Sequence, residues 1–296
     1  MTDGLVVVDK PGGCTSHDVV ARLRKAYAQK RVGHAGTLDP SATGVLLVGL
    51  GRVTRLLRFL ADAGKAYEGR VVFGVATDTL DADGSEISRA PMPLDRSVIE
   101  RAAHTFTGEI MQVPPMVSAV KIDGRRLHEL AREGKEVDRV PRPVRVDRFD
   151  LVDFVPGDFP EATVVVECSS GTYVRTLAAD LGSALGGCAH LARLRRMRVG
   201  SFDLHEAHSL DAVEADPYAV VLTPAAAMRD LARVEVDAAT SRAVSHGAKL
   251  DAGDLGVSGS EGPFAVCDGS GDLIAVYERH RRALKPAVVL VEAASS

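Results

Sequence analysis

The chain has 296 residues, of which 46% are hydrophobic and 26% are charged. This balance is typical of a globular protein and excludes a disordered or fibrous one. Because no run of about 18 apolar residues occurs and the first residues lack a basic leader, we expect a soluble, cytoplasmic protein without membrane association. The four cysteines form no Cys-x-x-Cys pair, which argues against a zinc knuckle or a disulfide framework.

Charge is unevenly distributed along the sequence. The formal net charge is −4, yet residues 1–60 carry nine Lys or Arg against four Asp or Glu, and residues 201–296 carry eight against fifteen. Arginines also cluster at 125–126 and 193–198. A basic N-terminal body permits binding of a polyanion on one surface, although solvated faces would account for the same clusters.

Hydrophobic patterns predict a series of strands and helices in the first 200 residues. The apolar run 5–8 predicts a strand, and Thr15 with Asp18 fits a capping box that starts a helix running to residue 28. A glycine-rich loop covers 31–44. After it we expect, in order, a strand at 45–48, a helix at 53–60, a strand at 67–75, a polar loop at 77–84, a strand at 162–168, a helix at 174–185 and a strand or extended arm at 189–199.

Two regions depart from this series. Residues from about 114 to 145 combine proline pairs, basic residues and a short helical stretch at 127–132, which predicts a long excursion from the core. After about residue 228, short strands alternate with Gly and Asp turns, which predicts a small β-rich module. The irregular order of strands and helices favours the α+β class, with one domain at 1–228 and a second at 229–296.

One carboxylate lies in an unusual setting. Asp39 is the only acidic residue between Gly33 and Gly44, where glycines let the backbone approach a ligand, and Pro40 restricts Asp39 to an extended geometry. Two interpretations are open from spacing alone: an Asx turn before a proline, or a nucleophilic or acid–base carboxylate of the kind that attacks a glycosidic carbon.

A second acidic stretch looks at first like a metal loop. Asp81-x-Asp83-Gly84 resembles the start of a calcium loop, but its twelfth position is Ala90, where a bidentate Glu is required. We therefore expect no metal there.

Several ordered blocks between residues 5 and 200 share one resemblance. They are 9–20 (DKPxGxTSHDVV), 31–44 (RVGHAGTLDPxATG), Tyr67 with 73–81 (FGxxTDTxD), 114–121 (PPMxSAVK), 171–176 (GTYVRT) and 194–196 (LRR). This set resembles the TruB family, the bacterial tRNA pseudouridine-55 synthases. The C-terminal module resembles the PUA-type RNA-binding domain of that family, through its β patterning.

The resemblance implies both a fold and an activity. It implies an α+β pseudouridine synthase catalytic domain with a mixed, mainly antiparallel sheet, followed by a small PUA-like β domain. The activity would be isomerisation of uridine 55 in the T arm of tRNA, after the base is flipped out, with residues 114–145 gripping the RNA. Because no electron or group passes to a carrier, we expect no cofactor and no metal, and we expect a monomer without a protein partner.

The resemblance also implies roles for single residues. Asp39 would form a covalent adduct with the target nucleotide, Tyr67 would stack on the flipped uracil and accept a proton, and Arg175 would pair with the aspartate. Substrate-binding roles are implied for four further residues: Lys10 supporting the pocket, His34 where the extruded bases leave the loop, and Tyr173 and Leu194 as pocket residues.

Simpler roles are also open to these residues, and rival functions to the whole protein. Without the family, Tyr67 and Tyr173 would be half-buried strand residues and Arg175 a surface ion pair. An RNA-binding folding factor would not need a carboxylate that faces a polyanion. A glycosidase would need a second carboxylate, and no acidic residue in the matched blocks can be assigned as its general acid. One departure from the family is His128, which stands where a Tyr is usual.

Overall fold

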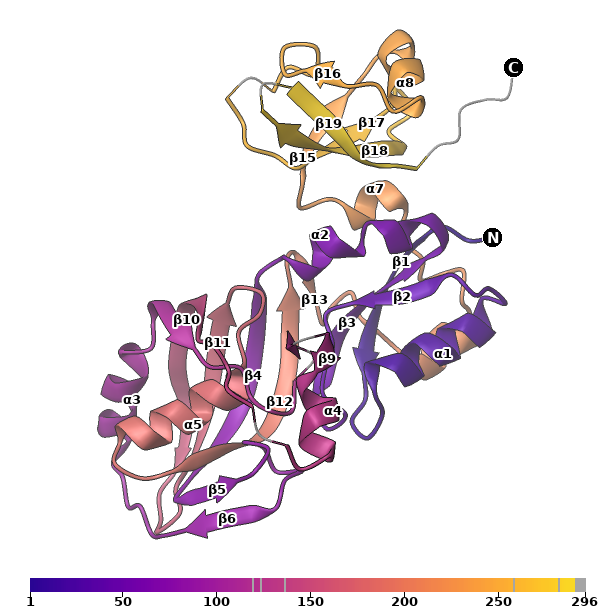
Figure 1. Ribbon diagram of the computed structural model, residues 1–296. Coiled ribbons are helices and arrows are strands. Elements are labelled where there is room, and N and C mark those ends of the chain that lie inside the picture. Colours follow the sequence, from indigo (N-terminus) through magenta and orange to yellow (C-terminus); the bar gives the residue numbers. More distant parts are fainter. Residues whose placement is uncertain (119, 123, 136, 258, 282, 291–296) are drawn as a thin grey trace.

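The computed structural model describes residues 1–118, 120–122, 124–135, 137–257, 259–281 and 283–290. In this part of the chain two sheets dominate, one of ten strands and one of five (Figure 1). The larger comprises β1 (Gly4–Lys10), β2 (Val32–Ala35), β3 (Thr43–Leu50), β4 (Lys65–Phe73), β7 (Gly108–Gln112), β10 (Arg142–Val155), β11 (Glu161–Cys168), β12 (Ala189–Val199), β13 (Phe202–Asp203) and β14 (His208–Ser209). The smaller comprises β15 (Ala232–Glu235), β16 (Leu250–Asp251), β17 (Phe264–Cys267), β18 (Leu273–His280) and β19 (Ala283–Val289).

Two short strand pairs and the helices complete the described structure. The pairs are β5 (Val75–Thr77) with β6 (Glu86–Arg89), and β8 (Lys121–Ile122) with β9 (Arg125–Arg126). The helices are α1 (Ser16–Ala26), the 3-10 helix η1 (Gly51–Arg55), α2 (Leu57–Ala61), α3 (Arg96–His104), α4 (Leu127–Arg132), α5 (Val174–Ala184), α6 (Leu210–Ala215), α7 (Pro224–Ala227) and α8 (Ala238–Ser245). Among the described helices, none has the length and apolar character needed to cross a membrane.

The large sheet is mixed and mainly antiparallel, so the predicted α+β class is confirmed. Its main path runs β14-β1-β3-β12-β4-β11-β10-β7. Only the β1–β14 and β3–β12 pairs are parallel. Helices α3 and α5 cover the β4–β11–β10 half with one hydrophobic cluster, and α1 and α6 cover the β1–β3 half with another.

The apolar residues of strand β1 contribute to two hydrophobic clusters, one on each face of the large sheet. Successive side chains of a strand point to opposite faces. Val6 and Val8 accordingly join the cluster under α1, whereas Leu5 and Val7 join a cluster on the other face that includes residues of η1, α2 and the five-stranded sheet. Helix α1 begins where its capping box predicts: the Thr15 side chain accepts from the Asp18 N–H, and the Asp18 carboxylate accepts from the Thr15 N–H.

The central strand β12 joins the two halves of the large sheet. It pairs in parallel with β3, with Arg196 opposite Gly44, and antiparallel with β4, with Arg196 opposite Tyr67. Gly44 has φ +102°, and a Cβ there would lie 2.2 Å from the Arg196 carbonyl oxygen. Only glycine therefore allows β3 and β12 to approach this closely.

Several elements differ from those predicted. Residues 32–35 of the glycine-rich segment, predicted as loop, form β2 because they pair with β3. The helix predicted at 53–60 is divided into η1 and α2. Helix α3 and strands β7 and β10 were not predicted, and α8 interrupts the β-rich module.

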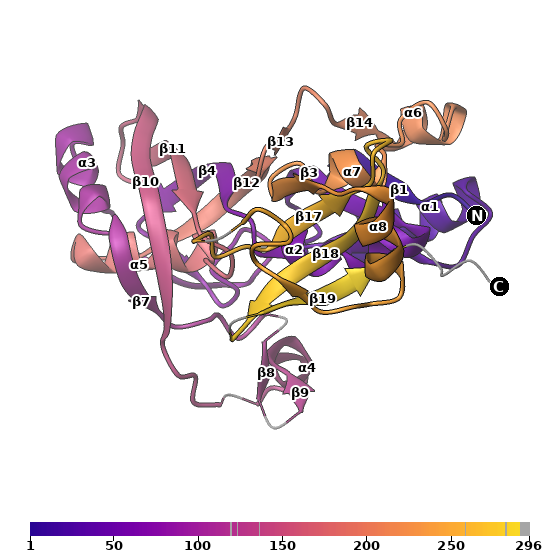
Figure 2. The same cartoon turned by 90° about the horizontal axis from the view of Figure 1, so that it is seen from above.

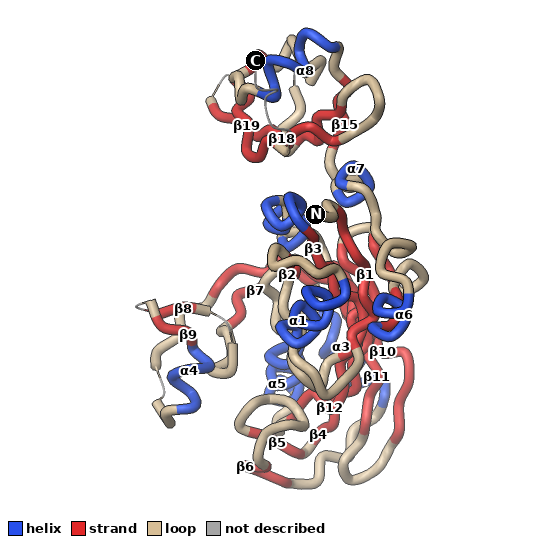
Figure 3. Tube along the Cα trace, turned by 90° about the vertical axis from the view of Figure 1, so that its right-hand side faces the viewer, coloured by secondary structure: helices blue, strands red, loops and turns tan. Residues whose placement is uncertain are grey.

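The predicted excursion contains β8, β9 and α4, which stand away from the large sheet (Figures 2 and 3). Helix α4 spans the residues predicted to be helical. The side chain of His128, the departure from the family pattern, lies outside the described residues. The five-stranded sheet packs close to α2 and α7, and Arg52 of η1 donates from Nη1 to the Leu290 carbonyl at 2.7 Å.

Candidate active site

The loop that carries Asp39 is tied down on both sides. On one side, the buried Ser16 hydroxyl accepts from the Leu38 N–H at 2.9 Å and donates to the Leu38 carbonyl at 3.1 Å. On the other, the fully buried Lys10 side chain donates to three carbonyls, those of Pro11 (2.9 Å), Pro40 (3.1 Å) and Ala42 (2.7 Å). These contacts fix the backbone on either side of Asp39, so its carboxylate is held in place before any ligand binds.

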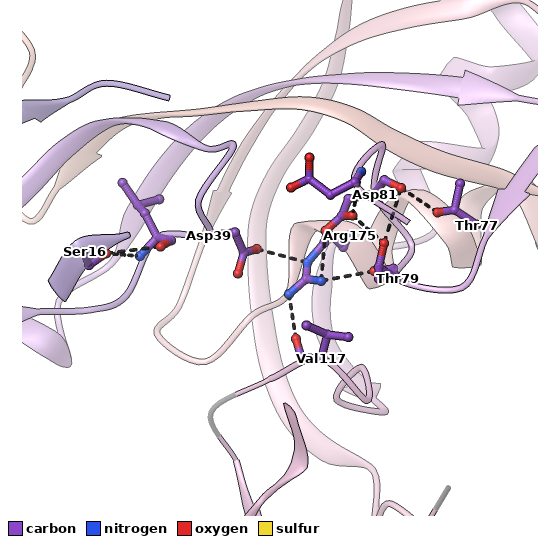
Figure 4. Close-up of polar contacts among 9 residues, drawn as sticks. Ser16, Asp39, Thr77, Thr79, Asp81, Val117 and Arg175 are labelled. Carbon is purple, nitrogen blue, oxygen red and sulfur yellow. Dashed lines mark hydrogen bonds and ion pairs between the residues drawn. The ribbon is translucent and has the colours of Figure 1, made fainter. Parts of the chain in front are cut away.

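Arg175 lies at the centre of a charged cluster that includes Asp39 (Figure 4). Its Nε is 3.1 Å from Asp39 Oδ2, and its Nη1 is 3.0 Å from Asp81 Oδ2. The same guanidinium donates to the carbonyls of Thr79, at 3.1 Å, and Val117, at 2.8 Å. The Arg175 side chain is 5% exposed and that of Asp39 is 37% exposed. The cation is therefore buried while its carboxylate partner stays open to a ligand.

The carboxylate of Asp39 makes a charged contact and no Asx turn. In the described part of the chain it accepts no hydrogen bond from a backbone N–H, and its partner is Arg175. Burial raises the pKa of Asp39 above its usual range, Arg175 acts against this rise, and repulsion from Asp81 and Asp83 adds to it. The ionised form is thus less hydrated than an ordinary surface carboxylate and is held by one cation, which suits a nucleophile.

Asp39, Arg175 and Leu194 lie where two cavities meet. One cavity, of about 270 Å³, is lined by Tyr67, Tyr173, Lys65, Arg196 and segments 36–39 and 169–175. The other, of about 480 Å³, is lined by segments 41–43, 68–70, 81–82 and 191–195. The smaller cavity, with two aromatic side chains, suits a planar ring, and the larger one suits the polar groups of a bulkier ligand.

Tyr67 forms part of the wall of the smaller cavity, opposite Arg196 on the neighbouring strand. Its side chain is buried, which raises the pKa of its phenol, and Arg196 acts against that rise. The phenol is therefore neutral in the free protein. Arg196 itself donates from Nε to the Val45 carbonyl at 2.7 Å and from Nη2 to the Gly36 carbonyl at 3.1 Å.

Tyr173 is positioned by a side chain from β7. The Tyr173 N–H donates to Gln112 Oε1 at 2.8 Å, and Gln112 Nε2 donates to the Tyr173 carbonyl at 3.1 Å. Gln112 is buried, so this pair of hydrogen bonds links the first turn of α5 to the end of β7.

Two of the predicted binding residues lie outside the cavity walls. Lys10 is under the Asp39 loop, where it contacts backbone carbonyls. His34, on β2, packs edge-on against His17 with ring centroids 5.5 Å apart. Burial lowers the pKa of His34 to about 4, so its imidazole is neutral near pH 7.

Sequence reasoning missed four residues of the site: Asp81, Lys65, Arg196 and Gln112. Asp81 and Arg196 fall inside the blocks that resemble the family, and membership of a block could have marked both as candidates. Lys65 lies two residues before Tyr67 on β4, and the period of two along a strand puts both on the same face. Gln112 gave no local signal. A second carboxylate, Asp81, thus lies in the site as a partner of Arg175.

Comparison with known proteins finds one family along most of the chain. The chain matches three family models: TruB family pseudouridylate synthase, N-terminal domain, at 24–174; tRNA pseudouridylate synthase B, C-terminal domain, at 175–220; and tRNA pseudouridine synthase II, C-terminal, at 231–291. It is 47% identical over 290 residues to tRNA pseudouridine synthase B of Rhodococcus jostii, covering 97% of this chain and 93% of the relative. With the protein of that name from Symbiobacterium thermophilum it shares 50% identity over 246 residues, 83% of this chain and 82% of the relative.

Solved structures resemble the fold over nearly its full length. A chain of a Cbf5–Nop10–Gar1 complex matches with a TM-score of 0.78 and 26% identity, covering 98% of this chain and 85% of the other. A chain of an H/ACA RNP bound to a substrate RNA matches with a TM-score of 0.75 at 23% identity, covering 98% and 86%, a likeness that concerns the fold alone. From the family models and the relatives together, the chain belongs to the TruB family of pseudouridylate synthases.

Proposed function

We propose that this protein is a tRNA pseudouridine synthase that isomerises uridine 55 in the T arm of tRNA. The observation that supports this most directly is the position of Asp39: an ionisable carboxylate, paired with the buried Arg175, at the junction of a ring-sized cavity and a larger polar one. The relatives named tRNA pseudouridine synthase B support tRNA as the substrate.

The reaction follows from what these residues do in turn. An oxygen of Asp39 forms a bond to C1′ of the ribose, and the C1′–N1 bond breaks with its electron pair passing to the uracil. The detached ring turns against Tyr67 in the smaller cavity, and C5 then bonds to C1′ as the bond to Asp39 breaks. The ring regains its conjugation when C5 loses its proton and N1 takes one from solvent. Tyr67 is our proposed acceptor: its neutral phenol takes the C5 proton at the oxygen while its own O–H proton passes to solvent. No cofactor or metal takes part in this scheme.

RNA binding would use surfaces outside the cavities as well as the cavity walls. The target base must leave its stack, at a cost of a few kcal/mol that pocket contacts offset. We assign the grip on the T arm to the excursion at about 114–145 and supporting contacts to the C-terminal module at 229–296, with residues 1–228 as the catalytic domain. His34 would contact the bases that leave the loop, Tyr173 and Leu194 would hold the target base in the pocket, and Lys10 would support the Asp39 loop. We further propose that the enzyme acts as a monomer, because the described residues of one chain supply both cavity walls, and that it acts in the cytoplasm.

The test uses the full chain and an unmodified tRNA transcript. After incubation, pseudouridine is labelled chemically and mapped by primer extension, beside a transcript with cytidine at position 55. We expect one new stop, at uridine 55 only. No label at any position would contradict the enzyme, and a label elsewhere would contradict the assigned target.

A further inference from the structure

Two buried cations line the smaller cavity without a carboxylate partner. The side chains of Lys65 and Arg196 are 7% and 1% exposed, and both belong to the cavity wall beside Tyr67. Lys65 Nζ donates to the carbonyls of Ala61 and, at 2.6 Å, Ala63. Within the described residues neither Lys65 nor Arg196 forms an ion pair, and these two carbonyls are the acceptors of Lys65, which leaves one of its three N–H groups uncommitted.

Such an arrangement is unfavourable in the free protein. A buried charge loses its hydration, and carbonyl dipoles replace only part of what water or a carboxylate supplies. Lys65 and Arg196 also repel each other, an effect that acts with burial to lower the pKa of Lys65. The unfavourable terms are relieved when an anion forms between them. A neutral uracil is no such anion, but the uracil released by cleavage of C1′–N1 is.

We propose that Lys65 is a further catalytic residue, whose ammonium donates a hydrogen bond to the uracil as negative charge develops on it. This inference rests on the proposed function. When C1′–N1 breaks, its electron pair spreads over N1 and the carbonyl oxygens of the ring, and Lys65 stays protonated throughout. The charge disappears when C5 bonds to C1′. A donor fixed in a site that excludes water stabilises such developing charge without having to reorganise.

The alternative is a structural role. The carbonyls of Ala61 and Ala63 lie at the C-terminal end of α2, and a lysine that bonds to them also stabilises that helix end. Loss of that cap would lower thermal stability. Loss of the cap would lower the rate equally for substrates whose uracil anions differ in stability. Loss of a donor to the uracil would not, and this difference separates the two roles.

The first experiment varies the leaving group. Single-turnover rates at saturating enzyme are measured for Lys65→Gln, Lys65→Arg and wild type on a T-arm RNA with uridine or 5-fluorouridine at the target position. Fluorine stabilises the uracil anion and blocks only the final proton loss, so formation of the rearranged nucleoside is followed by nuclease digestion and chromatography. Lys25→Gln, on the exposed face of α1, is the matched control, and melting temperatures are recorded for all variants.

The expected loss depends on the substrate. Removing one donor to a developing anion costs about 100-fold in rate. We expect that loss for Lys65→Gln on uridine, about 10-fold on 5-fluorouridine, and partial recovery in Lys65→Arg. Equal losses on both substrates would overturn the inference and leave the structural role. If wild type does not convert uridine at all, the proposed function fails instead.

A second measurement remains valid if Lys65→Gln does not fold. Burial lowers the pKa of Lys65 to about 8, and the groups that face it are Arg196 from β12, Cys168 from β11 and Asp62 after α2. Burial raises the pKa of Cys168 to about 11, well above this range. The wild-type rate should therefore fall between about pH 7 and 9 as the ammonium is lost, whereas Lys65→Arg should show no fall. The same alkaline limb in both proteins would refute the role of Lys65.

Discussion

The two walls that meet at Asp39 balance their charges in opposite ways. Arg175 is paired with two carboxylates, Asp39 and Asp81, so its wall is electrically satisfied in the free protein. Lys65 and Arg196 are bonded to neutral carbonyls, so the wall that faces the ring keeps excess positive charge. The Arg175 wall therefore holds the nucleophile in position before the reaction. The charges of the Lys65–Arg196 wall are stabilised only when negative charge forms on the ring during the reaction.

The largest effect should come from removing the nucleophile on the satisfied wall. Asp39→Asn keeps size and shape but removes charge and nucleophilicity, so pseudouridine formation should fall below detection. Binding of tRNA should persist, because most affinity comes from phosphate contacts and T-arm shape. Filter binding and pseudouridine mapping on the same preparation measure both. If more than about a tenth of the rate survives, a barrier change of only about 1.4 kcal/mol, Asp39 is not the nucleophile.

A smaller loss is expected when the second carboxylate of Arg175 is removed. Asp81→Asn leaves the guanidinium with one charged partner instead of two and loosens its position. We expect the single-turnover rate to fall 10- to 100-fold, equivalent to about 1.4–2.7 kcal/mol, with little change in affinity for tRNA. Asp83→Asn, at an exposed neighbouring position, is the control. Equal effects in both variants would mean that Arg175 needs only Asp39.

The pH dependence of the rate tests the same wall. Because burial raises the pKa of Asp39, the rate should fall with acidification at a pH above that of an ordinary aspartate. Repulsion from Asp81 raises the pKa of Asp39. Without the Asp81 charge, that repulsion is lost and Arg175, with no second carboxylate partner, lowers the pKa of Asp39 further. The acid limb should therefore move to lower pH in Asp81→Asn. A limb that stays in place, or moves upward, would contradict this coupling.

The smallest effect concerns the support of the Asp39 loop. Ser16→Ala removes two hydrogen bonds and leaves the buried N–H and carbonyl of Leu38 without this partner, which should cost about 1–3 kcal/mol in the free energy of unfolding. Denaturant unfolding measures it, with Ser183→Ala on the exposed side of α5 as control. A change no greater than that of the control would show that Lys10 alone holds the loop.

Elements with local signals were predictable from the sequence. The capping box of Thr15 and Asp18 fixed the start of α1, and α5 begins at the predicted Val174. Strand β10 gave no such signal, although it is 14 residues long. Its pairing with β11 shifts register between Val146 and Arg148 and again between Leu151 and Asp153, and such bulges break the alternation by which a strand is recognised.

The site was predictable only in part. Asp39, Tyr67 and Arg175 were found through the family blocks, whereas their spacing alone favoured simpler structural roles. Asp81 was noted in a family block and as an incomplete calcium ligand, but it was given no role in the site, because its contact with Arg175 joins residues 94 positions apart in the chain. Lys65 escaped notice because a lysine on a strand is ordinarily exposed, and its burial depends on how α2 and β12 pack around it.

The hydrogen bond from Arg175 Nη2 to the Val117 carbonyl links the nucleophile's cation to the root of the excursion. Three segments that are remote in sequence thus converge on one planar, five-donor group: the Asp39 loop, the 77–84 loop and residues 113–118. A displacement of the excursion on meeting RNA must either carry the guanidinium with it or release that donor. The excursion is in this way connected to the reaction centre, and a change in its position would reach the Asp39 carboxylate through the Arg175 side chain.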